Sequence, residues 1–334
     1  IEFPFNDEDF LIYDYQLDRF GNIHLLGLVS IEETRRKTIF KTNVEREARL
    51  FSFYKGEDDV KEYKLGILDM DEGFLSQIKM RTDNLGKLQC SGFYSDNKGN
   101  SMKGIFVFTL NVENREIENI SSQEFTDEYI EQFLSDRQKR KKERKKRKNK
   151  DSKYDELYNF KIRDLVMKEG GGFYVVAEYY IFYVTTTTDS KGNTRTTEHY
   201  VYKDLMVINV LENNQVTWFT RIPKYQHSTN DGGRYSGIAY GINSDNSLNI
   251  IFNDHRDNAS ILSPEDVKNS VIRKAQTVLV TIDTEGNATK TPLMSAKESK
   301  TVVMPKIHSQ CKPNDIVLYA ALGRKNRFIN VLLK

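Results

Sequence analysis

The chain of 334 residues has little cysteine and no long apolar run. Cys90 and Cys311 are its two cysteines, and no stretch of about 18 consecutive apolar residues occurs. Two cysteines cannot form a disulfide framework, and their spacing matches no metal site. Without a long apolar run, no helix is expected to span a membrane. The apolar content of 38% and the charged content of 29% are typical of a globular protein with a core.

The sequence also lacks the common catalytic motifs. It contains no Gly-rich phosphate loop, no His-Glu-x-x-His motif and no Gly-x-Ser-x-Gly motif. Its five histidines are scattered, without the spacing of metal ligands. We therefore expect no cofactor and no metal, and the sequence favours a non-catalytic protein over an enzyme.

Basic charge is concentrated in one segment. Residues 137–150 hold eleven Lys or Arg residues and one Glu, whereas the rest of the chain carries 39 basic and 47 acidic residues. A basic segment on an acidic body can contact an anionic surface or an acidic partner. Few aromatic residues lie among the basic ones and no base-reading motif is present, so we do not expect nucleic acid as a partner. A solvated arm without a specific role is the alternative.

One short pattern recurs along the chain. The strings "LDRFGNIHLLGLVSI" (17–31) and "TDNLGKLQCSGFYSD" (82–96) both read as polar residues, a glycine and then an apolar run. Three weaker copies follow, and such periods indicate repeat architectures. The apolar runs begin at Ile23, Leu88, Phe173, Leu248 and Ile316.

Each copy is accompanied by further strand-like runs. These runs are rich in β-branched and aromatic residues and are separated by turn sequences such as "DSKGN" and "DTEGN". Four strands per repeat predict propeller blades, which bury their faces against their neighbours. The recurring run is nearly continuous in apolar residues, as expected of a strand buried on both faces. We therefore predict an all-β fold, a β-propeller of four-stranded blades with five repeats, as a single domain over residues 1–334.

The closure of the ring is predicted from the two ends of the chain. The fifth repeat reaches Lys334 without a fourth strand, and "IEFPFN" at residues 1–6 could supply it. Such a closure would avoid an open sheet edge. A β-sandwich or two separate β domains are the alternative.

Residues 122–157 do not fit the repeat and are predicted to be a helical insertion rich in lysine and arginine. Thr126 is the expected N-cap, and an apolar stripe over residues 129–134 would dock the helix on the body. A second helix is predicted at 263–274, because Ser263 and Pro264 favour a helix start. Four basic residues of the arm are predicted to form a contact surface: Lys141, Lys142, Arg144 and Lys145.

The segments 173–188 and 194–210 predict a long hairpin whose outer part projects beyond its blade. Protruding aromatic side chains suit contact with a partner or stacking on sugars. Packing against the neighbouring insertion is the alternative. The candidate binding residues are Tyr179, Tyr180, Phe182, Tyr183, Tyr200 and Tyr202.

Two polar stretches are further candidates for a binding site. "FNDHRDN" (252–258) places Asp254, His255 and Asp257 at the end of a strand, where a histidine beside carboxylates could move protons or bind a ligand. "QHSTNDGGRYSG" (226–237) offers Asp231 for ligand binding. A salt-bridged loop and a plain turn are the respective alternatives.

Three further strings in residues 155–290 are distinctive: "GGGFYVVAEYY", "YVYKDLMVINV" and "DGGRYSGIAYG". With these strings the segment resembles secreted or cell-envelope β-propeller-like proteins of Bacteroidota. The resemblance implies export by a removed signal peptide and an extracytoplasmic location, either periplasmic or associated with the outer membrane. It brings no catalytic residues.

Two functions follow from these features. The first is a non-catalytic binding or scaffold protein of the bacterial cell envelope, which contacts a protein partner, such as an outer-membrane assembly, through the aromatic hairpin and the basic arm. The alternative is a glycan-binding or glycan-hydrolysing propeller enzyme, since five-bladed propellers host glycosidases. Hydrolysis needs two carboxylates about 5–10 Å apart in one pocket. Asp231, Asp254 and Asp257 are the candidates, placed at the axial pocket.

Overall fold

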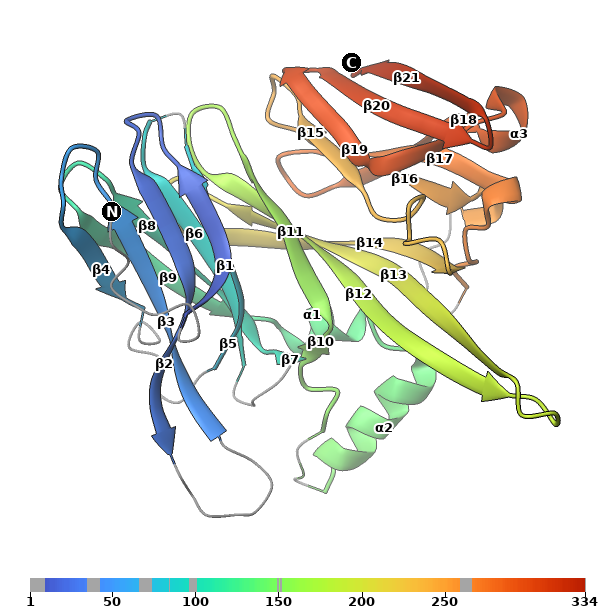
Figure 1. The fold of residues 1–334 in the computed structure, drawn as a ribbon, viewed down its shortest axis with the longest axis horizontal. Helices are drawn as coiled ribbons and strands as arrows, with labels where there is room; N and C mark the ends of the chain where they lie inside the picture. Colours follow the sequence, from blue (N-terminus) through green and yellow to red (C-terminus); the bar gives the residue numbers. More distant parts are fainter. Residues whose placement is uncertain are drawn as a thin grey trace. The chain divides into compact units, whose positions relative to one another are not determined.

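The chain is divided into two compact units of antiparallel β-sheet (Figure 1). The computed structural model describes residues 10–34, 43–65, 74–83, 85–95, 101–148, 150, 152–258 and 266–333. The first unit is Ile1–Phe125 with Asn213–Gln215, and the second is Thr126–Glu212 with Val216–Lys334. The predicted all-β fold is confirmed.

The first unit holds two four-stranded sheets whose strands pair in chain order. A two-residue strand, β7 (Ser101–Met102), lies between β6 and β8 in the chain. The first sheet contains β1 (Phe10–Leu17), β2 (Ile23–Thr34), β3 (Asn43–Phe53) and β4 (Val60–Lys64). The second contains β5 (Phe74–Thr82), β6 (Leu88–Ser95), β8 (Gly104–Asn111) and β9 (Glu116–Glu124).

The second unit holds two four-stranded sheets and one three-stranded sheet, again in chain order. They are preceded by α1 (Asp127–Glu131), α2 (Asp136–Lys146) and β10 (Leu157–Tyr158). The third sheet contains β11 (Phe160–Met167), β12 (Phe173–Thr188), β13 (Thr194–Val210) and β14 (Val216–Thr229). The fourth contains β15 (Ala239–Ile242), β16 (Leu248–His255), β17 (Ala275–Ile282) and β18 (Ala288–Ser295). The fifth contains β19 (Val302–Lys312), β20 (Asp315–Leu322) and β21 (Lys325–Leu332), and the short helices are η2 (Arg256–Asn258), η3 (Ile272–Lys274) and α3 (Ala296–Ser299).

The five predicted repeats correspond to these five sheets. The second strands of the first four sheets begin at the residues predicted from the recurring apolar runs, and β20 begins one residue earlier than predicted, at Asp315. A closed ring is not found among the residues that the structure describes. The N-terminal strand predicted to close it, at residues 1–6, lies outside the described residues.

Four turns between strands share one hydrogen-bonding pattern, and two of them belong to the polar strings that recur at 17–31 and 82–96. An aspartate Oδ1 accepts hydrogen bonds from the backbone N–H groups two and four residues later, at 2.8–2.9 Å. The glycine three residues after the aspartate has a positive φ of 82° to 91°, which a side chain with a Cβ rarely adopts. The four turns contain Asp18 and Gly21, Asp83 and Gly86, Asp189 and Gly192, and Asp283 and Gly286.

A bulge in the first strand links adjacent sheets within each unit. The register of β1 shifts between Ile12 and Asp14, and that of β11 shifts between Ile162 and Asp164. Asp14 accepts a hydrogen bond from the backbone N–H of Met80 in β5, at 3.0 Å. Asp164 accepts one from the Tyr240 hydroxyl, in β15. The repeats within a unit are therefore tied together through their first strands.

Consecutive sheets also share their apolar cores. β16 is buried along its whole length, and its neighbouring residues Ile250 and Ile251 belong to two different clusters. Ile250 packs in a cluster with Tyr174 of the third sheet, and Ile251 in one with Leu318 of the fifth. This confirms the prediction that the second strand is buried on both faces and that sheets pack side by side.

The helical insertion is confirmed in part and one predicted helix is wrong. Thr126 caps α1, accepting a hydrogen bond from the Tyr129 N–H at 3.2 Å, as predicted. The insertion contains two helices, because Ser135 starts α2 with a new cap. Residues 266–274 form no α-helix and hold only the 3-10 turn η3, whereas the predicted start at Ser263 and Pro264 lies outside the described residues.

Candidate functional site

The insertion packs on the third sheet through aromatic rings. Phe133 lies 5.2 Å from Phe160 of β11, and Phe160 lies 5.9 Å from Tyr179 of β12, both measured between ring centroids with near-perpendicular planes. Tyr129 is buried, lies 5.1 Å from Phe219 of β14, and its pKa is raised well above the usual value by burial. The predicted apolar stripe therefore fixes the insertion on the sheet.

A cavity of about 780 Å³ lies between the insertion and this sheet, and we call it the insertion cavity. Its volume falls in the range of small-molecule sites, about 300–1,000 Å³. Six of its lining residues are aromatic, and the others include amides, a serine, lysines and two carboxylates. The lining residues are Phe133, Leu134, Ser135, Gln138, Lys153, Tyr154, Glu156, Leu157, Tyr158, Asn159, Phe160, Tyr179, Lys203, Asp204, Lys224, Tyr225 and Val267.

The sheet contributes a charged residue to the cavity through a bulge. The register of β13 and β14 shifts between Lys203 and Leu205, and Asp204 lies at this shift. Asp204 Oδ1 accepts hydrogen bonds from Arg221 Nη2 at 3.0 Å and from the Lys224 backbone N–H at 3.2 Å. Glu156, the second carboxylate, is buried in the chain that returns from α2.

Two lysines of the cavity lie beside tyrosine rings. The Lys203 ammonium is 5.0 Å from the ring centroid of Tyr225 and 5.9 Å from that of Tyr179. The Lys153 ammonium is 5.4 Å from the ring of Tyr154. Cations at these distances are attracted by the ring faces. The wall therefore combines flat aromatic surfaces with positive charge.

A buried charge cluster lies in the same sheet. Lys224 Nζ donates hydrogen bonds to Glu178 Oε1 at 2.5 Å and to Gln226 Oε1 at 2.8 Å, and Arg163 Nε donates to Glu178 Oε2 at 2.7 Å. Glu178 and Lys224 are inaccessible to solvent. Burial lowers the pKa of Lys224, and the Glu178 charge opposes that shift. This cluster fixes the strands behind the cavity.

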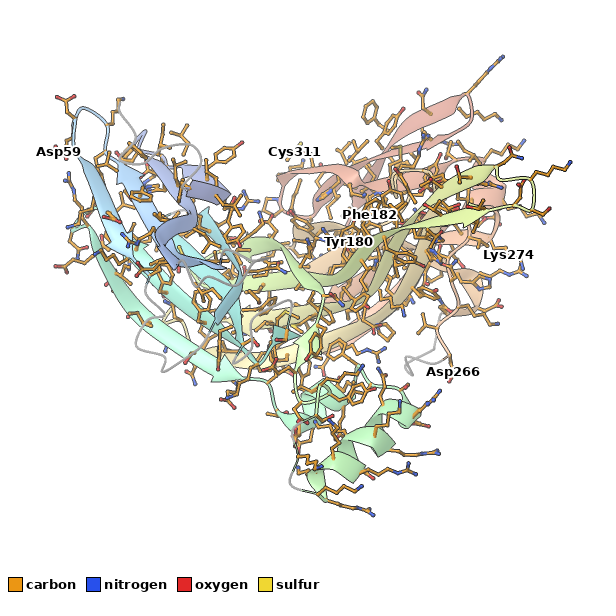
Figure 2. All side chains as sticks on the ribbon, turned by 60° about the horizontal axis from the view of Figure 1, so that its bottom comes forward. Asp59, Tyr180, Phe182, Asp266, Lys274 and Cys311 are labelled. Carbon is orange, nitrogen blue, oxygen red and sulfur yellow. The ribbon has the colours of Figure 1, made fainter. Side chains whose placement is uncertain are left out.

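The predicted aromatic hairpin exists, and its rings pair across the strands. Figure 2 labels two of these residues, Tyr180 and Phe182. Tyr180 faces Tyr202 at 4.8 Å between ring centroids, and Phe182 faces Tyr200 at 5.1 Å. Tyr183 stacks on His199 at 4.4 Å and is 41% exposed. Of the six candidates, the structure brings Tyr179 into the insertion cavity and leaves the other five outside its lining.

The structure brings Asp254, His255 and Asp257 together, and hydrogen bonds and ion pairs within the fold occupy all four polar candidates. Asp254 is fully buried and paired with Lys290, and Asp257 is paired with Lys268 at 2.8 Å. His255 Nδ1 accepts a hydrogen bond from the Asp257 N–H at 3.2 Å. Asp231 accepts hydrogen bonds from the Ser228 hydroxyl and the Gly233 N–H within its own turn.

None of these four candidates lines the insertion cavity. Glu156 and Asp204, which do line it, were not predicted as site residues. The string "YDELYNF" at residues 154–160 carried the available signal, because three aromatic and three acidic or amide residues follow the basic run.

The basic arm divides into buried and exposed residues. Lys142 is 3% exposed, and its ammonium donates to Asp127 Oδ1 at 2.7 Å, so it cannot serve as the predicted surface contact. Lys141, Arg144 and Lys145 are exposed, as predicted.

Among the described residues no group of three or more His, Cys, Asp or Glu side chains could hold a metal ion. The described part of the chain also contains no helix long and apolar enough to cross a membrane.

No family model and no curated protein matches the chain. Similar solved structures include an exo-beta-1,3-galactanase from Clostridium thermocellum, at 7% identity and a TM-score of 0.31, with 96% of this chain and 57% of that chain covered. They also include Bacillus subtilis levansucrase in complex with oligosaccharides, at 11% identity and a TM-score of 0.33, with 98% and 84% covered. This chain thus spans 57% of the length of the galactanase.

Both of these proteins are carbohydrate-active, and the prediction of a non-catalytic scaffold that contacts a protein partner in the cell envelope is corrected on this finding. At these TM-scores neither activity is transferred to the chain.

Proposed function

We propose that the chain binds a glycan in the insertion cavity. The observation that supports this is the composition of the cavity wall, which combines six aromatic side chains with hydrogen-bonding groups. A sugar ring has an apolar C–H face and a rim of hydroxyl groups. The faces of Tyr154, Tyr158 and Tyr225 suit the first, and the Asn159 and Gln138 amides suit the second.

The arrangement of the cavity favours an extended ligand over a compact apolar one. Tyr158 is 38% exposed although it lines the cavity, so the aromatic surface continues to the solvent side. A purely apolar ligand would take water from the Lys203 ammonium and give it no hydrogen bond in return. A sugar offers it hydroxyl groups.

Hydrolysis of the glycan is a second candidate function, supported by the two carboxylates on the cavity wall. A glycosidase needs one carboxyl group that gives a proton to the leaving oxygen and a second that attacks the sugar or activates water. Glu156 comes from the insertion and Asp204 from β13, so two segments far apart in the sequence each supply one carboxylate to the cavity lining. The axial carboxylates predicted from the sequence are not needed for this proposal.

Binding is tested by screening the purified chain against a glycan array and measuring the best oligosaccharide by calorimetry. We expect Tyr154→Ala and Tyr158→Ala each to weaken binding about tenfold or more, which corresponds to about 1.4 kcal/mol. Tyr183→Ala is the matched control, because Tyr183 is an exposed tyrosine outside the cavity lining. Failure of every oligosaccharide to bind at millimolar concentration, or equal losses in all three variants, would overturn the proposal.

Hydrolysis is tested with Glu156→Gln, which preserves the shape of the side chain. If the two carboxylates cleave the glycan, this variant loses product formation by about a thousandfold while it still binds the oligosaccharide. Asp204→Asn is a less specific test of catalysis, since it also removes the ion pair with Arg221, whose side chain is 6% exposed. Unchanged product formation in Glu156→Gln would exclude this residue as a catalytic acid or base.

A further inference from the structure

The basic helix α2 begins at the insertion cavity. Ser135 caps the helix, and its hydroxyl accepts a hydrogen bond from the Gln138 N–H at 3.3 Å, while the Gln138 side chain accepts one from the Ser135 N–H at 2.8 Å. Both residues also line the cavity. A ligand that leaves the cavity on this side would therefore meet the first turn of α2.

One side of α2 is fixed to the body and the other faces solvent. Lys142 and Lys146 both donate to the Asp127 carboxylate, at 2.7 and 3.0 Å, and Lys142 is buried. Figure 2 shows the remaining long side chains of this green helix pointing away from the body, with nitrogen at their tips. The exposed basic residues of the helix besides Lys146 include Arg137, Arg140, Lys141 and Arg144.

The composition of α2 distinguishes between classes of anionic partner. Its sequence, "DRQKRKKERKK", contains no apolar residue, so the helix has no face that could enter a bilayer. It also contains no aromatic ring on which a nucleobase could stack. The cavity that the helix adjoins does contain aromatic rings, which we assign to a sugar.

Positive charge continues from the helix into the cavity. Lys153 and Lys203 line the wall beside tyrosine rings, as described above. The charge of Asp204 is compensated by Arg221, at 3.0 Å. A sugar stacked on Tyr225 would place its substituents next to the Lys203 ammonium, which contacts tyrosine rings and forms no ion pair with a carboxylate among the described residues. This position favours a carboxylate or sulfate group.

We infer that the ligand of the insertion cavity is an acidic glycan, with carboxylate or sulfate groups, and that α2 binds the continuation of its chain outside the cavity. This inference rests on the proposed glycan binding. It explains why a strongly basic helix is held beside an aromatic cavity on an otherwise acidic chain.

The test compares ligands that differ only in charge. An oligogalacturonate is measured against its methyl-esterified form, and a sulfated galactan oligosaccharide against its desulfated form, with the full chain at 50 and 500 mM salt. We expect the acidic form of at least one pair to bind about tenfold tighter or more at low salt, and this difference to shrink at high salt. The pair that shows the difference identifies the acidic group.

The role of α2 is tested with Arg137→Gln, Arg140→Gln, Lys141→Gln and Arg144→Gln combined. Glutamine preserves helix propensity, and the variant spares the two lysines that hold Asp127. We expect its affinity for the acidic oligosaccharide to fall to that for the neutral one. A matched variant removes four exposed charges elsewhere and is expected to bind as the natural chain does: Lys191→Gln, Arg195→Gln, Arg324→Gln and Lys325→Gln.

Equal affinity for acidic and neutral forms would overturn the inference and leave the proposed glycan binding intact. Absence of binding to any of the four oligosaccharides would overturn both. If anionic lipid vesicles or single-stranded RNA compete as well as the acidic oligosaccharide does, or if Tyr158→Ala leaves the acidic affinity unchanged, α2 is a general polyanion site and the inference fails.

Discussion

The second and third sheets share one strand order but differ in what they enclose. In the second sheet, the inner strands β6 and β8 have eight residues each and are almost entirely buried. In the third sheet, β12 and β13 have 16 and 17 residues and extend past their neighbours as a long hairpin (Figure 1). The insertion cavity and the helical insertion adjoin the third sheet, and the buried pair Glu178–Lys224 lies within it. The site therefore lies where the chain departs from its repeat.

The side chains buried in the second and third sheets also differ in kind. The second sheet is filled by apolar side chains such as Phe106, Phe108 and Leu88, which need no specific partner. The third sheet buries Glu178, which depends on Lys224 and Arg163 for compensation. A buried ion pair contributes little net stability when intact, yet it is costly to break.

The largest expected effects on stability come from one substitution among the buried residues of each sheet. Phe106→Ala removes a side chain that is 1% exposed and should lower the free energy of unfolding by about 3–5 kcal/mol. Lys224→Met should cost about 3 kcal/mol, because it leaves Glu178 buried with one fewer cation. Urea unfolding followed by circular dichroism measures both.

A double substitution tests whether the loss of stability in Lys224→Met comes from the charge left on Glu178. Glu178→Gln combined with Lys224→Met removes both charges, and we expect it to recover more than half of the loss caused by Lys224→Met alone. The same Glu178→Gln change should not improve the stability of Phe106→Ala. Additive losses in the charge pair would show that the two residues are not coupled.

Most of the fold could be predicted from the sequence because it is repeated. The apolar run that starts at Leu88 has the continuous pattern of a strand buried on both faces, and the aspartate and glycine of each turn are fixed by local hydrogen bonding. The predicted helix at 263–274 is absent over its described part, residues 266–274, because a start signal alone does not form a helix. The helix also needs an apolar face with a surface to cover.

The site could be predicted far less well, because it depends on contacts between distant segments. Tyr179 was a candidate from its own strand, but nothing local links it to Glu156 or Asp204. The bulge that positions Asp204 and the cap at Ser135 that redirects the chain into α2 are both tertiary outcomes. Asp231 and Asp254 had suggestive neighbours in the sequence, yet their hydrogen bonds serve the fold.

The turns of the two sheets give an intermediate effect. Gly86 joins β5 and β6 with a φ of 87°, and an added Cβ would lie 2.8 Å from Arg19 Nε. Gly192 lies at the tip of the long hairpin with a φ of 82° and open space around it. We expect Gly86→Ala to cost about 1–2 kcal/mol of stability, from backbone strain and crowding together.

Gly192→Ala carries the same backbone strain, but we expect it to change the global stability by less than about 0.5 kcal/mol. The tip pairs only with itself, so it can open locally while the sheet stays folded. Hydrogen exchange of the tip amides should rise in this variant. Gly86→Asn is the control, since asparagine tolerates a positive φ, and it should cost less than Gly86→Ala. Equal losses of global stability in Gly86→Ala and Gly192→Ala would contradict the distinction between the β5–β6 turn and the hairpin tip.

The smallest effect concerns a turn that departs from the shared pattern. Lys168 occupies the position in the β11–β12 turn that Asp83 occupies in the β5–β6 turn, since the backbone N–H of each bonds the carbonyl four residues later. Its ammonium donates to Asn209 Oδ1 at 2.9 Å, and burial lowers the pKa of Lys168 to about 8. An unfolded lysine has a pKa of about 10.4. Between these values the unfolded chain binds more protons than the folded chain, so stability rises with pH.

Lys168→Met removes this penalty and should raise the free energy of unfolding by about 1 kcal/mol at pH 7, after allowance for the solvent that screens a half-buried group. The gain should shrink as pH rises above 8 and be lost by about pH 10.4, where the folded and unfolded lysines are both largely neutral. Lys168→Arg keeps its charge at every pH tested, so its free energy of unfolding should fall further below that of the natural chain between pH 8 and 10. Parallel pH profiles for all three proteins would mean that burial at this turn does not disfavour the charge.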